Sequence, residues 1–157
     1  PIAEFAHQIL GPLAPQNPPK AEREGCDVLV SDYSDFGHQA LMLREALEEL
    51  YEQEPQASCA IVCSDLDIAR QYYDALSELP KIRLICKGEF SFSAGIDVTE
   101  VSQIKGLEFD YIVIPDANNQ NYPITNIARR ELHVASTRAM HQLWVNYVGF
   151  KSKVLPK

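Results

Sequence analysis

The chain has 157 residues, of which 46% are hydrophobic and 23% charged, and this composition is typical of one soluble globular domain. It contains no apolar run near the ~20 residues of a transmembrane helix, and its first residues lack the basic start and apolar stretch of a signal peptide. We therefore expect a cytoplasmic protein without membrane contacts. A start at Pro1 rather than Met indicates a fragment of a longer protein.

The net charge is −8, from 14 Lys and Arg against 22 Asp and Glu. Domains that bind nucleic acid tightly by themselves are more often basic. Much of the acidity lies in residues 44–52, so a contact with DNA through another surface stays open. Tight, independent binding of DNA by this chain is not expected.

At the amino end, apolar residues recur at helical spacing and predict a short helix over residues 2–10, which Gly11 and Pro12 end. Residues 13–25 are rich in proline and predict an extended connector. A strand is expected at 26–30. A long helix follows to about Tyr51, with Ser34 or Asp35 as its N-cap.

The middle and end of the chain continue the alternation of strands and helices. Residues 59–63 form an uninterrupted apolar run, which predicts a central strand buried on both faces. A helix that Ser64 or Asp65 caps should follow and run to about Leu79. The later elements expected, in chain order, are strands at 82–86, 98–101 and 111–114, a helix at 124–140 and a strand at 142–148.

Strands that alternate with helices predict an α/β domain with a mostly parallel sheet and helices on both sides. We expect a single domain over residues 1–150 and a loose tail over 151–157.

The cysteines and histidines do not indicate a metal site. Cys59 and Cys63 would stand ~13 Å apart on one strand, too far to share a zinc ion. Cys26 and Cys86 also lie beside apolar runs, so we expect four reduced structural cysteines and no bound metal. The histidines show no mutual spacing of metal ligands; they are His7, His38, His133 and His141.

Two blocks of residues carry the chemistry. In the first, Lys105, Gly106 and Glu108 follow a predicted strand, so opposite charges flank a glycine at what we expect to be the strand's carboxyl end, where open α/β sheets bind ligands. The simpler alternative is an ion pair on a solvated loop. In the second block, Arg130, Thr137 and Arg138 follow at helical spacing, and a guanidinium near a helix end could reach phosphate. The simpler alternative here is a surface arginine paired with Glu131 or Asp116.

In this order and spacing, residues 100–117 and 129–139 resemble motifs V and VI of the UvrD/Rep-type superfamily 1 helicases, and the wording of the motifs is most like that of the HelD branch. The resemblance implies the second RecA-like domain of an ATP-driven motor. The expected fold is a RecA-like three-layer sandwich of the P-loop NTPase type that lacks its own Walker A loop.

The resemblance also implies roles for individual residues. Arg138 would be the arginine finger that stabilises the γ-phosphoryl group, and the others implied at the ATP site are Lys105, Gly106, Glu108, Arg130 and Thr137. Ser102 and Gln103 lie where many relatives contact single-stranded DNA, but Glu100 and Ser102 replace the usual Thr-x-His pattern. Asn119 and Tyr122, in a loop rich in amides, could contact a nucleic-acid backbone or stack on a base, although a plain solvated loop is the alternative.

The sequence contains no Gly-x-x-x-x-Gly-Lys-Ser/Thr loop. ATP and Mg²⁺ would therefore be bound mainly by an N-terminal RecA-like domain of the same protein, and this chain alone should not hydrolyse ATP. The expected partners are that domain and single-stranded DNA. Two alternatives remain: a remodeller that binds RNA polymerase without unwinding duplex, and a non-catalytic interaction module.

Overall fold

The computed structural model describes residues 1–13, 27–91 and 93–156 of the chain. The extended connector predicted over residues 13–25 therefore lies almost wholly outside the described residues, as does Cys26. No helix in the described part is both long and apolar enough to cross a membrane.

The described residues form one six-stranded sheet in which every neighbouring pair of strands is parallel. In chain order the strands are β1 (Asp27–Tyr33), β2 (Ser58–Cys63), β3 (Ile82–Leu84), β4 (Gly95–Glu100), β5 (Phe109–Ile114) and β6 (Ala139–Val148). Their order in space is β1-β6-β5-β2-β4-β3, so β2 is internal while β1 and β3 are the edges.

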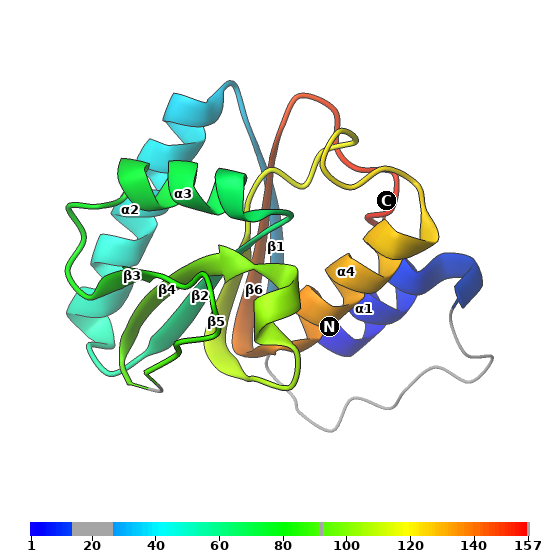
Figure 1. Ribbon diagram of the computed structural model, residues 1–157. Helices are drawn as coiled ribbons and strands as arrows, with labels where there is room; N and C mark the ends of the chain where they lie inside the picture. Colours follow the sequence, from blue (N-terminus) through cyan, green and yellow to red (C-terminus); the bar gives the residue numbers. More distant parts are fainter. Residues whose placement is uncertain (14–26, 92, 157) are drawn as a thin grey trace.

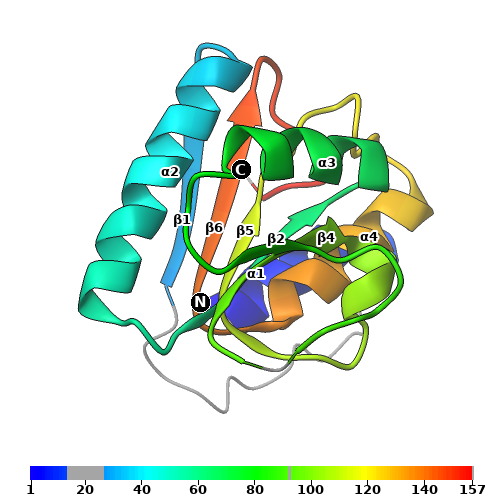
Figure 2. The same ribbon diagram turned by 60° about the vertical axis from the view of Figure 1, so that its left-hand side comes forward.

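Helices cover both faces of the sheet (Figures 1 and 2). The helices are α1 (Ile2–Leu10), α2 (Phe36–Gln53), α3 (Leu66–Ala75) and α4 (Asn126–Thr137), with short 3₁₀ turns η1 (Gly11–Leu13) and η2 (Val101–Ile104). Residues of α1, η2 and α4 share one apolar core with the sheet, and residues of α2 and α3 share a second. The α/β sandwich with a parallel sheet predicted from the sequence is confirmed.

Strand β2 shows why the sheet has two cores. Ala60 and Val62 belong to the core on the α1/α4 face, whereas Cys59, Ile61 and Cys63 belong to the core on the α2/α3 face. All five side chains are fully buried. Successive side chains of a strand point to opposite faces, so an uninterrupted apolar run is needed to fill both.

The helices begin where polar side chains cap them. The side chains of Asp35, Asp65 and Thr125 each accept a hydrogen bond from the backbone N–H three residues further on, at 2.8, 2.9 and 3.1 Å. Such caps satisfy backbone donors that the first turn of a helix leaves without partners. The caps predicted for the second and third helices are confirmed at Asp35 and Asp65.

Two predicted helices end earlier than expected. The helix predicted to reach Leu79 ends at Ala75 and is followed by turns, and Pro80 disfavours helical backbone at Leu79. The helix predicted over 124–140 ends at Thr137, because strand β6 already begins at Ala139, which pairs with Phe109 of β5.

The end of the chain is not the loose tail that we expected over residues 151–157. Ser152, Val154 and Leu155 are buried, and the latter two belong to the core on the α1/α4 face. Ser152 fixes the segment, because its backbone N–H donates to the Ala117 carbonyl at 2.9 Å and its hydroxyl donates to the Tyr122 carbonyl at 2.6 Å. Residues 151–156 are thus part of the fold.

Candidate functional site

A cleft of about 460 Å³ opens at the amino edge of the sheet, on the side that α4 covers. Most of the residues that line it are the first residues of strands or residues just before them, and the others are part of the β3–β4 connection and Asp97, the third residue of β4. They are Ser58, Phe90, Ser93, Asp97, Gly106, Leu107, Glu108, Phe109 and Arg138. Three residues that the sequence singles out, Gly106, Glu108 and Arg138, therefore face one cleft.

Strand pairing brings the two blocks together. The Phe109 N–H donates to the Arg138 carbonyl at 2.9 Å, and Phe109 pairs with Ala139 as β5 and β6 begin side by side. Gly106 and Glu108 precede β5 just as Arg138 precedes β6. Residues about thirty positions apart in the sequence thus become neighbours at the start of adjacent parallel strands.

The position of the first block corrects our expectation. We predicted that Lys105, Gly106 and Glu108 lie at the carboxyl end of the preceding strand. Strand β4 does end at Glu100, but η2 and the residues after it carry the chain back towards the amino edge, where β5 starts (Figure 1). Parallel pairing of β5 with β2 and β6 requires this return, so Gly106 and Glu108 lie at the opposite edge from the one expected.

Arg138 is partly buried, and its guanidinium is only partly satisfied. Its Nη2 donates to Thr137 Oγ1 at 3.2 Å, and Thr137 in turn donates to the Val134 carbonyl at 3.0 Å. The Nε atom of Arg138 is buried and has no hydrogen-bond partner. A buried donor without an acceptor costs free energy, so this side chain is suited to an oxygen-rich anion that enters the cleft.

Gly106 adopts a backbone conformation that residues with a side chain rarely adopt. Its φ is +79°, in the left-handed region, and a Cβ built there would meet nothing within 4 Å. The glycine is therefore required by backbone conformation rather than by crowding, and it leaves open space in front of the main chain.

A second cavity, of about 480 Å³, lies between α4, η2 and the carboxyl ends of β2 and β4. It is lined by Lys105 and Arg130 but also by Glu100 and Glu131. Burial and the Glu100 charge raise the pKa of Glu131, whereas Lys105 lowers it. Lys105 and Arg130, predicted beside ATP, therefore face a different cavity from Arg138, and its charge is mixed.

The two η2 residues predicted to contact nucleic acid are engaged within the domain. The Glu100 carboxylate accepts hydrogen bonds from both the backbone N–H and the hydroxyl of Ser102, and so caps η2. Gln103 Nε2 donates to the Cys86 carbonyl at 2.9 Å and ties η2 to the end of β3. In this arrangement neither side chain is directed to a phosphate.

The loop after β5 is likewise structural. Tyr122 is 1% exposed and lies in the core, so the expectation that it stacks on a base is wrong for this conformation. Asn119 Oδ1 accepts a hydrogen bond from the Lys153 N–H at 2.9 Å, which joins the loop to the packed end of the chain. The loop thus holds residues 152–155 by hydrogen bonds, a long-range contact that the sequence pattern did not show.

The structure also identifies polar residues that sequence reasoning missed. Arg129 Nη1 donates to the Ile9 carbonyl at 3.1 Å and joins α4 to the end of α1. Arg83 forms a 2.7 Å ion pair with Asp97, which is 5% exposed. A signal for this pair was present, because Arg83 is the single charge of β3 and Asp97 lies between the apolar residues Ile96 and Val98 of β4. No group of three or more potential metal ligands occurs among the described residues.

Comparisons with known proteins match part of the chain to a family model. Residues 95–146, from the start of β4 into β6, match the model of the UvrD-like helicase C-terminal domain. No curated protein matches the chain significantly.

Solved structures share the fold. The C-terminal domain of a possible DNA helicase from Lactobacillus plantarum WCFS1 is similar with a TM-score of 0.74 and 23% identity, over 98% of this chain and 87% of that one. Cas3 from T. fusca, solved with AMPPNP, is similar with a TM-score of 0.54 and 16% identity, over 87% of this chain but only 20% of that one. A weaker likeness, at a TM-score of 0.47 and 10% identity, covers 75% of this chain and 45% of the UvsW helicase from bacteriophage T4.

The RecA-like fold expected from the sequence is therefore confirmed by the parallel six-stranded sheet and its structural neighbours. The matched segment contains Gly106, Glu108 and Arg138, the three residues that meet in the amino-edge cleft. Over residues 95–146 this chain is thus similar to the UvrD-like helicase C-terminal domain, and its whole fold is similar to that of a possible DNA helicase's C-terminal domain.

Proposed function

We propose that the chain is the second motor domain of an ATP-dependent superfamily 1 helicase or translocase, and that Arg138 acts as its arginine finger. The observation that carries the proposal is the convergence of Arg138, Gly106 and Glu108 on one cleft, in which the buried Nε of Arg138 has no acceptor. A transferred phosphoryl group would supply that acceptor and is stabilised by a guanidinium.

The nucleotide would be shared between two domains. This chain has no Walker A loop, so the phosphate cradle and the Mg²⁺ ligands belong to an N-terminal RecA-like domain. Bound ATP with Mg²⁺ supplies the phosphoryl-transfer chemistry. On this side of the cleft, Arg138 would stabilise negative charge on the γ-phosphoryl group, and Thr137 holds the guanidinium in place. The open backbone at Gly106 permits close approach, and Glu108 is suited to accept hydrogen bonds from sugar hydroxyls.

Motion would follow from the same geometry. Arg138 directly precedes β6, and its carbonyl accepts a hydrogen bond from Phe109, the first residue of β5. A force on Arg138 would therefore act on the sheet directly. The cleft would close around ATP and open after hydrolysis. This domain would then move as a unit relative to the N-terminal RecA-like domain, and that movement would drive translocation along single-stranded DNA.

The test is ATP hydrolysis by the longer protein that joins this domain to a RecA-like domain with a Walker A loop. We expect Arg138→Ala to lower DNA-stimulated turnover by ~10³-fold, because finger arginines contribute at least that much. Arg70→Ala is the matched control, since Arg70 is exposed on α3 and pairs only with exposed Asp67 among the ion pairs described. Full activity of the Arg138→Ala protein would overturn the finger assignment.

A second candidate is an ATP-driven remodeller whose target is a protein such as RNA polymerase. It is favoured by the Glu100 carboxylate, which holds Ser102 where a phosphate contact was expected, and by the net charge of −8. The same assay separates the two candidates. Turnover that ignores single-stranded DNA but is lost in Arg138→Ala would retain the ATP site and favour the remodeller.

A further inference from the structure

The connection between β3 and β4 forms one wall of the amino-edge cleft. Phe90 and Ser93 of this connection line the cleft together with Leu107 and Phe109. The Phe90 ring packs at a tilt against the Phe109 ring, with centroids 6.0 Å apart. The wall therefore presents an aromatic side chain next to a hydroxyl, on the same cleft that Arg138 enters.

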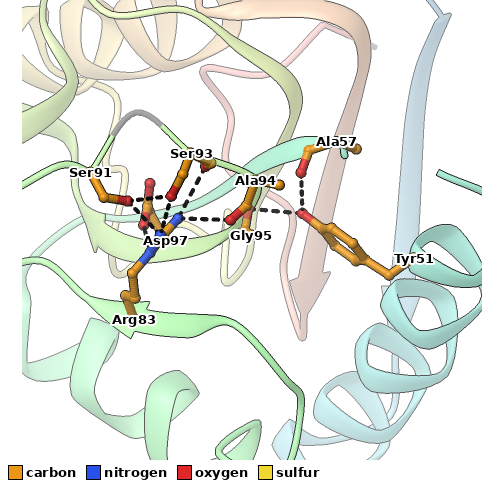
Figure 3. Close-up of polar contacts among 8 residues, drawn as sticks. All are labelled: Tyr51, Ala57, Arg83, Ser91, Ser93, Ala94, Gly95 and Asp97. Atoms are coloured by element: carbon orange, nitrogen blue, oxygen red, sulfur yellow. Dashed lines mark hydrogen bonds and ion pairs between the residues drawn. The ribbon is translucent and has the colours of Figure 1, made fainter. Parts of the chain in front are cut away.

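Arg83 holds this wall in place (Figure 3). Its Nη1 donates to the hydroxyls of Ser91 and Ser93, the latter at 3.0 Å. Its Nη2 donates to the carbonyls of Ser93 and Ala94, at 3.3 and 3.5 Å. One planar guanidinium thus binds Ser91, Ser93 and Ala94 as well as Asp97. The three donors of a lysine ammonium could not serve all of these acceptors.

Arg83 is itself fixed from behind. Its Nε donates to Asp97 Oδ1 at 2.7 Å, and this carboxylate is almost fully buried on β4. Gly95 allows the chain to enter β4 against this group: its φ is +134°, and a Cβ there would lie 2.6 Å from the Lys81 carbonyl oxygen and 3.0 Å from Arg83 Nη2. Tyr51 adds hydrogen bonds from its hydroxyl to the Ala57 and Gly95 carbonyls (Figure 3). The wall is therefore pre-organised.

The chemistry of the cleft distinguishes two halves. Arg138 is the one positively charged residue among the described residues that line the cleft. Arg83 lies behind the wall, and its N–H groups donate to Asp97 and Ser93. The half formed by Phe90, Leu107 and Ser93 has no positive charge to bind phosphate. An aromatic face with adjacent hydroxyl and carboxylate groups suits instead a planar base and the hydroxyls of a sugar.

We propose that Phe90 and Ser93 contact the nucleoside part of the nucleotide whose phosphates reach Arg138, and that Arg83 is the residue that positions them. This inference rests on the proposed function and adds to it a nucleoside subsite on the β3–β4 connection. Its consequence is specific: the connection controls binding of the nucleotide, whereas Arg138 controls turnover.

The test compares KM for ATP, kcat, and inhibition by tripolyphosphate, a probe that has the phosphates but no nucleoside, in the same two-domain protein. We expect Phe90→Ala to raise KM for ATP about tenfold, which corresponds to the loss of one base–aromatic contact, with kcat changed less than about twofold. Inhibition by tripolyphosphate should be unchanged. Phe90→Trp should restore KM, and Ser93→Ala should raise KM by a smaller factor.

Arg83→Lys tests the positioning role, because lysine keeps the ion pair with Asp97 but loses the fork that holds Ser91 and Ser93. We expect it to raise KM as Phe90→Ala does, without lowering the midpoint of thermal unfolding. An equal loss of ATP and tripolyphosphate binding in Phe90→Ala, or an unchanged KM, would overturn the inference. If a variant unfolds, Ser93→Ala, which removes one hydroxyl of an exposed residue and leaves the ion pair between Arg83 and Asp97 in place, decides in its place.

The two proposals fail separately. If Arg138→Ala abolishes turnover while Phe90→Ala and Ser93→Ala leave KM unchanged, the finger stands and the nucleoside subsite is wrong. If Arg138→Ala retains full turnover, the proposed function fails, and the nucleoside subsite that rests on it fails too.

Discussion

Replacing Arg83 by Met removes a buried charge partner while keeping an unbranched apolar stem. The Asp97 side chain is 6% exposed and the Arg83 side chain 27%, and their ion pair is 2.7 Å long. Removing one partner of a buried pair leaves the other charge without compensation and typically costs ~3–5 kcal/mol. We expect Arg83→Met to lower the free energy of unfolding by about that amount, a large part of the ~5–15 kcal/mol of an ordinary domain.

The cost should depend on pH in a defined direction. Burial raises the pKa of the Asp97 carboxyl above its usual 3.8, and Arg83 opposes this by its charge and hydrogen bond. Without Arg83 the pKa of Asp97 in the folded state rises further. The folded protein then binds more protons than the unfolded one, so stability falls as pH rises through the window above 3.8. The defect of Arg83→Met should therefore be larger at pH 8 than at pH 5.

The assay is urea unfolding followed by the fluorescence of Trp144, the single tryptophan. Arg83→Met/Asp97→Asn should recover most of the loss, because it removes the uncompensated carboxylate. Arg70→Met, which breaks the exposed pair with Asp67, should cost less than ~1 kcal/mol. A cost below ~1 kcal/mol for Arg83→Met, or a double variant no more stable than the single one, would refute the reasoning.

Further predictions concern burial. Burial, Arg138 and His7 lower the pKa of His133 below 6.5. Just below pH 6.5 the unfolded state therefore binds more protons than the folded state, and the free energy of unfolding should fall as pH drops. His133→Gln should flatten that part of the curve of unfolding free energy against pH. Burial raises the pKa of Cys59 to about 12 and also raises that of Cys63. An alkylating reagent at pH 7.5 should therefore label both thiols only after denaturation, which peptide mass spectrometry would show. Rapid labelling of the native protein would contradict their burial. Ile112→Ala should cost ~2–5 kcal/mol of unfolding free energy in the urea assay, because this side chain is fully buried, and a cost below ~1 kcal/mol would count against the packing.

The elements and their layering follow from local patterns in the sequence. Polar caps at Asp35 and Asp65 mark helix starts, and the apolar run at β2 specifies a strand buried on both faces. These are local properties: a cap acts over three residues and side chains of a strand alternate with period two, so both can be recognised without knowing the neighbours. The two motif blocks were also visible, because their residue types and spacing are fixed along the chain.

Which residues share a site depends instead on how the strands pair and the helices pack. Lys105 and Gly106 are adjacent in sequence yet face different cavities, and Arg138 joins Gly106 rather than Arg130, because β5 and β6 start side by side at the amino edge. Burial was equally non-local: Tyr122 lies in a core that joins α1, α4, the sheet and the end of the chain. Such contacts depend on strand order and on long-range packing, neither of which is encoded in the local pattern around a residue.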